Sequence, residues 1–105
     1  MTTSIEAHAG GIRVIGEMTV YTAAQIKQPL VDAIADGPPT IELDLSGVPE
    51  FDTAGLQLLL LAQREALARG RHFQIGPESH IVREVLELCG ARGLLPGATP
   101  LEGRP

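Results

Sequence analysis

The chain has 105 residues, of which 44% are apolar, and a formal net charge of −5. This size predicts one domain over residues 1–105 with its own core, and the negative charge argues against duplex DNA or an anionic membrane surface as the main partner. One cysteine excludes an internal disulfide, and the start "MTTSIEAHAGG" lacks a signal-peptide pattern, so we expect a cytoplasmic protein.

The first third of the chain predicts a hairpin followed by a helix. Strand-like pieces flank Gly10-Gly11, where Ile12 and Val14 alternate with Arg13. Apolar residues at helical spacing over 22–36 predict a helix with Thr22 as N-cap, a kink at Pro29 and a stop at Gly37.

The rest of the chain alternates strands with helices. Segments 40–48 and 71–76 have the pattern of strands, and 53–70 and 79–90 that of helices. Ser79 is a suitable N-cap for the last helix, and Cys89 falls on its apolar stripe, which predicts a core position. Ser46 and Gly47 are expected to form a turn after their strand. The core should span about 12–95, with 96–105 as a flexible tail.

The leucine run Leu56–Leu61 is too short to span a membrane, which requires about 20 apolar residues, so no direct membrane insertion is expected. It predicts a buried helix instead. We expect burial of Leu56, Leu59 and Leu60, with part of Leu58 or Leu61 left exposed.

This alternation predicts an α/β fold. The expected architecture is a mixed sheet of four to five strands, antiparallel at the start, with about four helices packed mainly on one side. In such sheets function tends to lie beyond the carboxyl ends of the strands, and the segment "SGVPEFDTAG" is one of the loops found there.

The segments "LDLSGVPEFDTAGLQLLL" and "FQIGPESHIVREVLELCG" resemble the STAS domain, the fold of anti-sigma factor antagonists. The resemblance covers about Ile12 to Leu95, and its specific part is "DLSGV" followed by "DTAGL". The combination of "GEMTVYTA" with "DTAGLQLLLL" resembles the free-standing STAS proteins associated with chemotaxis histidine kinases.

This resemblance implies a phosphoacceptor, because in the family the hydroxyl residue after the Asp accepts phosphate from an anti-sigma factor that is also a serine kinase. That role corresponds to Thr53. The implied partner-binding residues are Asp52, Thr53, Ala54, Gly55 and Gln57. The family's "GELD" is "GEMT" here, so Thr19 stands where the family has an acid.

Physical chemistry is compatible with this role. If Asp52 caps the helix, Thr53 lies in its first turn, where free backbone N–H groups and the helix dipole stabilise an anion. The alternatives remain that Asp52 and Thr53 are only a helix start, and that Gly55 serves close packing.

The sequence favours interaction over catalysis. His8, His72 and His80 are too isolated to form a metal site, and Asp44 and Asp52 come with no oriented histidine, metal set or glycine-rich pocket loop. We therefore expect neither an enzyme nor a cofactor or metal. With few aromatic residues for base stacking, no nucleic acid is expected either.

Three hypotheses of function remain, all of them based on protein binding. The first is an adaptor for an anti-sigma factor or another signalling kinase, switched by phosphorylation of Thr53. The second is a STAS partner within a chemotaxis or two-component cluster, and the third a regulatory subunit of a lipid ABC transporter. A weak homodimer is compatible with each.

Overall fold

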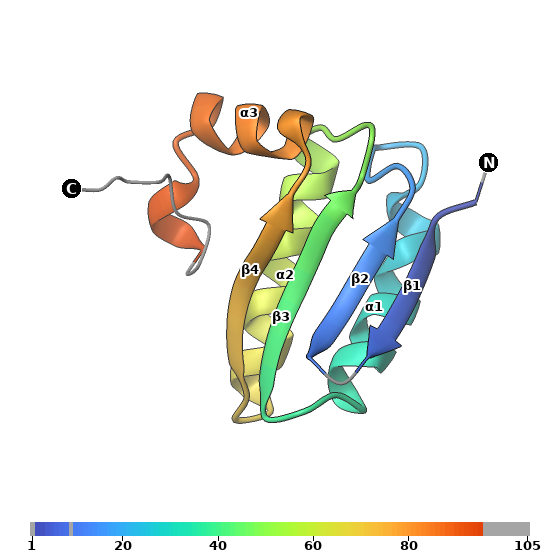
Figure 1. Cartoon of the computed structure of the whole chain (residues 1–105), viewed down its shortest axis with the longest axis vertical. Coiled ribbons are helices and arrows are strands. Elements are labelled where there is room, and N and C mark those ends of the chain that lie inside the picture. The colour runs from blue at the N-terminus through green and yellow to red at the C-terminus, as the bar shows by residue number, and fades with distance from the viewer. Residues whose placement is uncertain (1, 9, 96–105) are drawn as a thin grey trace.

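The computed structural model describes residues 2–8 and 10–95 (Figure 1). The tail predicted for 96–105 lies outside the described residues. The elements in chain order are β1 (Ser4–His8), β2 (Gly11–Ile15), α1 (Ala23–Ala35), β3 (Thr40–Gly47), α2 (Thr53–Ala68), β4 (His72–Glu78), α3 (His80–Leu88) and the short 3-10 helix η1 (Arg92–Leu94).

The four strands form one sheet in the order β1-β2-β3-β4. β1 and β2 are antiparallel, as the Gly10-Gly11 pair predicted, whereas β2, β3 and β4 are parallel neighbours. Figure 1 shows α1 and α2 on one face of the sheet and α3 at the end where β2, β3 and β4 finish. The mixed α/β fold is thus confirmed, with three α-helices and one 3-10 helix among the described residues in place of about four helices.

The core lies between the sheet and the helices α1 and α2. Side chains along a strand alternate between the two faces, so every second residue of β3 points inward, and Ile41, Leu43 and Leu45 are fully buried. Helix α1 contributes Ile26, Leu30 and Ile34 at helical spacing. The opposite face carries the polar positions, including Arg13 of β2, which pairs with Asp44 of β3 at 3.2 Å.

The leucine run is buried on a different stripe from the one predicted. Leu58 and Leu59 are buried, whereas Leu56, Leu60 and Leu61 are partly buried and pack against the core. The predictions of a buried Leu59 and of an exposed part of Leu58 or Leu61 are confirmed, the second one at Leu61, whereas Leu56 and Leu60 are less buried than predicted. Five leucines in six positions exceed the width of one helical stripe, so the pattern alone does not define the inward direction.

Three further local predictions are corrected. Thr22 occupies the N-cap position of α1 without a side-chain cap bond, because its hydroxyl instead accepts from the N–H of Thr19 at 3.0 Å and donates to the carbonyl of Glu17 at 2.9 Å. Ser46 and Gly47 belong to β3, since Gly47 still pairs with Ile15 of β2. Cys89 is exposed, because α3 ends at Leu88 and its apolar stripe does not continue to the cap.

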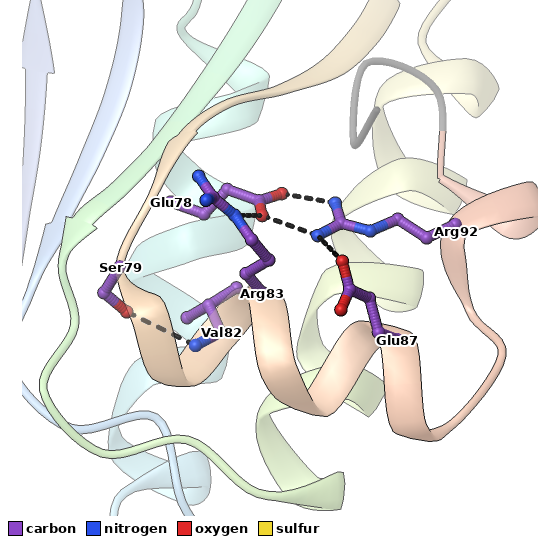
Figure 2. Close-up of polar contacts among 6 residues, drawn as sticks. All are labelled: Glu78, Ser79, Val82, Arg83, Glu87 and Arg92. Atoms are coloured by element: carbon purple, nitrogen blue, oxygen red, sulfur yellow. Dashed lines mark hydrogen bonds and ion pairs between the residues drawn. The ribbon is translucent and has the colours of Figure 1, made fainter. Parts of the chain in front are cut away.

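An ion-pair cluster fixes the segment after α3 to the end of β4 (Figure 2). Nη1 and Nη2 of Arg92 donate to Oε2 and Oε1 of Glu78 at 2.7 and 2.8 Å, in a two-pronged pair. The side chain of Glu78 is only 7% exposed and that of Arg92 15%. The hydrogen bonds that Arg92 donates to Glu78 raise the pKa of Arg92 above its usual value, although burial opposes the charge. Arg83 contacts Glu78 at 3.4 Å, and Glu87 lies 3.7 Å from Arg92.

Candidate functional site

The candidate site is formed by two loops beyond the carboxyl ends of β2 and β3. The first loop precedes α1 and contains Met18, and the second precedes α2 and contains Phe51. These two residues form an isolated parallel bridge. The N–H of Met18 donates to the carbonyl of Glu50 at 3.0 Å, and the N–H of Asp52 donates to the carbonyl of Met18 at 3.3 Å. The loops therefore behave as one ordered unit.

Asp52 joins this unit to the start of α2. Its Oδ1 accepts hydrogen bonds from the N–H groups of Ala54 at 2.9 Å and Gly55 at 3.3 Å, which makes it the N-cap that the sequence predicted. Its Oδ2 accepts from the N–H of Val20 in the other loop at 3.1 Å. One carboxylate thus sets both the first turn of the helix and the position of the neighbouring loop.

Thr53 is the first residue of α2 and is exposed. Ala54 is partly buried, and Gln57, one helical turn along, is exposed. The arrangement presents an exposed threonine at the positive end of a 16-residue helix.

Gly55 is buried because the two loops approach α2 closely. A Cβ at this position would lie 2.4 Å from the carbonyl oxygen of Met18 and 2.6 Å from the ring of Phe51. Gly55 thus serves close packing, but of α2 against the two loops rather than against the sheet. The five residues predicted to bind a partner are therefore brought together on the first turns of α2, but they differ in exposure.

Two residues of this surface, Val20 and Tyr21, were not predicted from the sequence. They are 66% and 87% exposed, although both are large and apolar or aromatic. The hydrogen bond from the N–H of Val20 to Asp52 holds this loop next to the residue that precedes Thr53. The sequence signal that could have indicated them is the pair of bulky residues in "MTVYTA". This pair lies between the end of β2 and the first turn of α1.

The "DLSG" segment has a structural explanation. Asp44 accepts hydrogen bonds from the N–H and the hydroxyl of Ser46, at 2.9 and 2.7 Å, and from Nε of Arg13. Burial opposes ionisation of Asp44, but the hydrogen bonds from Ser46 and Arg13 outweigh it and lower the pKa of the carboxyl. This carboxylate therefore stabilises the end of β3.

Within residues 2–8 and 10–95, no three His, Cys, Asp or Glu side chains gather in a way that could hold a metal ion. In the same part of the chain, no helix has the length and apolar character needed to cross a membrane.

Comparison with known proteins identifies the family. A family model described as "Mlab, STAS domain" matches residues 1–96. The chain belongs to the STAS family.

Relatives of this STAS domain include anti-sigma factor antagonists. It is 27% identical over 93 residues to the anti-sigma-F factor antagonist RsfB of Mycobacterium tuberculosis, covering 86% of this chain and 75% of that protein. An anti-sigma factor antagonist from Mycobacterium paratuberculosis, known from its crystal structure, is 30% identical in sequence. The two structures match with a TM-score of 0.73, covering 90% of this chain and 82% of the other. Phosphorylated SpoIIAA from Bacillus shares the fold at 22% identity, with a TM-score of 0.61 over 85% of this chain and 84% of the other.

The role of Asp52 as the N-cap of α2 can be tested by substitution. Asp52→Ala removes the acceptor of two helix N–H groups and of Val20, so we expect the free energy of unfolding to fall by about 1–2 kcal/mol. Urea unfolding followed by circular dichroism measures this change. Asp52→Asn is the matched control, because its amide oxygen can still cap the helix, and it should lose less than half as much. Equal stability of Asp52→Ala and wild type would contradict the capping role.

Proposed function

We propose that this STAS domain is an anti-sigma factor antagonist that binds a protein partner through the tip of α2 and is released by phosphorylation of Thr53. The observation that carries the proposal is the exposed Thr53 hydroxyl on a capped helix start, beside the exposed Val20 and Tyr21. The names of the relatives favour this hypothesis over a chemotaxis cluster or a lipid transporter. The partner is then an anti-sigma factor, and a serine or threonine kinase supplies the phosphate.

The helix start favours a phosphate at Thr53. Phosphorylation transfers the γ-phosphoryl group of ATP to the threonine oxygen, releases ADP and the hydroxyl proton, and adds about −1.5 to −2 charges at neutral pH. The positive end of α2 stabilises negative charge by about 0.3–1 kcal/mol. The modified domain should therefore remain folded.

The same phosphate opposes docking. Val20 and Tyr21 offer apolar and aromatic surface of the kind that becomes dry in a protein interface. A strongly hydrated dianion next to them has to be desolvated or left unpaired when a partner covers the loops. The switch thus acts on the surface rather than on the fold.

A binding experiment tests the proposal. Once an anti-sigma factor from the same genome has been purified, titration calorimetry compares wild type, Thr53→Ala, Thr53→Glu and the phosphorylated protein. We expect Thr53→Ala to bind as wild type does. The two charged forms should bind at least about tenfold more weakly, which corresponds to about 1.4 kcal/mol.

Thr40→Glu is the matched control, because Thr40 is exposed and lies at the start of β3, whereas the candidate loops follow its end. It introduces the same charge and should leave the affinity unchanged. Equal affinities for all forms would refute the switch, and Thr53 would then be only a helix-start residue.

A further inference from the structure

A groove between α1 and α2 reaches the first turn of α2. Its volume is about 420 Å³. Ala54, the residue after Thr53, lines it, and its apolar surface includes Leu58 and Leu61. The small side chains of Ala23 and Ala24 leave room between the helices on the α1 side. The groove therefore adjoins the surface proposed to bind a partner.

Two cations line this groove, Lys27 on α1 and Arg64 on α2. Both are exposed, and neither forms an ion pair or a side-chain hydrogen bond with any residue among 2–8 and 10–95. The other arginines of these residues each contact a carboxylate or a backbone carbonyl: Arg13, Arg69, Arg71, Arg83 and Arg92. In a chain with a net charge of −5, two cations without a carboxylate partner among the described residues thus line the same apolar hollow.

Solvated surface cations are common, and a single one would indicate nothing. Here two of them lie on different helices around an apolar floor, and the hollow is continuous with the exposed tip of α2. That combination matches helix-in-groove recognition, in which apolar side chains enter the hollow and charges on the flanks select the partner.

We infer that the α1–α2 groove binds an acidic amphipathic segment of the protein partner. An apolar side chain of that segment packs on Leu58 and Leu61, and carboxylates on its flanks pair with Lys27 and Arg64. The inference rests on the proposed function and extends it, since it gives the chemistry of the partner. It also explains how phosphate acts, because a dianion on Thr53, which precedes the groove residue Ala54, repels an acidic segment.

A pair of model peptides tests the charge preference. One is a helical peptide of about 18 residues with leucines along one face and glutamates on the flanks, and the other has every glutamate replaced by lysine. Nitrogen-15 NMR of the whole protein measures both affinities and locates the perturbed amides. We expect the glutamate peptide to bind at least about fivefold more tightly and to shift amides of Lys27, Ala54, Leu61 and Arg64.

Charge reversal sharpens the test. Lys27→Glu combined with Arg64→Glu should reverse the preference in favour of the lysine peptide, with an unchanged unfolding midpoint because both side chains are exposed. Arg69→Glu is the matched control. It lies just after α2 and outside the groove, so it should leave the preference unchanged.

Several outcomes would overturn the inference. These are no binding of the glutamate peptide, equal binding of both peptides, or shifts confined to other surfaces. Groove shifts that grow with the protein's own concentration, without peptide, would assign the groove to a second copy of the chain.

If charge reversal has no effect while Thr53→Glu still releases the anti-sigma factor, the inference fails and the proposed function stands. If the acidic peptide is preferred while Thr53→Glu does not weaken anti-sigma factor binding, the groove inference stands and the phosphorylation switch fails.

Discussion

Glu78→Ala is expected to lower the free energy of unfolding by about 3–5 kcal/mol, the cost of breaking a buried pair by removing one partner. The side chain of Arg92 is 15% exposed, and its guanidinium makes both of its short hydrogen bonds to Glu78 (Figure 2). Without that carboxylate, its remaining carboxylate is Glu87 at 3.7 Å, which is 54% exposed. Domains of this size are stable by only about 5–15 kcal/mol, so the variant would lose much of the total.

Chemical denaturation of three variants separates the stability contributed by the Glu78–Arg92 pair from that contributed by the neighbouring charges. Glu87→Gln is the matched control, because it removes the distant carboxylate, and it should cost less than about 1 kcal/mol. Combining Glu78→Met with Arg92→Met removes both charges and should recover most of the stability lost by Glu78→Ala. If Glu78→Ala unfolds at the same urea concentration as Glu87→Gln, the cluster does not hold η1 to the sheet.

Gly55→Ala is the second change with a large expected effect. The new Cβ would overlap the carbonyl of Met18, which is held in place by the N–H of Asp52, and the buried ring of Phe51. Neither neighbour can withdraw without opening the two loops. Overpacking of this kind costs about 1–3 kcal/mol or more, and alanine's better helix propensity recovers up to about 1 kcal/mol. We expect a net loss of about 2 kcal/mol.

A thermal melt should show this loss as a decrease in Tm of about 10 °C for a domain of this length. Gly93→Ala is the matched control, since a Cβ there would meet nothing within 4 Å. It should melt within about 2 °C of wild type. A Gly55→Ala protein that melts together with the control would show that the loops have room to move away from α2.

Most of the fold could be predicted from the sequence because its signals are local. Alternation in β3, the stop at Gly37 and the caps of α2 and α3 each depend on residues close in the chain. The departures have two causes. Thr22 bonds to Glu17 rather than capping its own helix, and Gly47 stays in β3 because β2 pairs with it. Contacts between distant segments decided the extent of β3, and the loop before α1 decided the role of Thr22.

The site likewise contains features that local sequence signals predict and features that depend on contacts between distant residues. Asp52 was predictable as a cap because a carboxylate before an apolar helical pattern has one common local use. The bond from Val20 to Asp52 was not predictable, since it joins residues 32 apart in the chain. For the same reason the sequence could not pair Lys27 with Arg64, whose proximity depends on the packing of α1 against α2.

The central position of β3 has a kinetic consequence. β2 and β4 pair with β3 in parallel, and the chain connects them to β3 through crossovers that contain α1 and α2. Each pairing therefore closes a loop of about 30 residues before its strand-to-strand hydrogen bonds can form. The β1–β2 hairpin can form early, whereas β3 can be completed only with most of the domain. Hydrogen exchange should therefore protect the amides of β3 up to the free energy of global unfolding, while those of β1 are released by local opening. The strand that leads to Asp52 and Thr53 would then be among the last parts of the molecule to open.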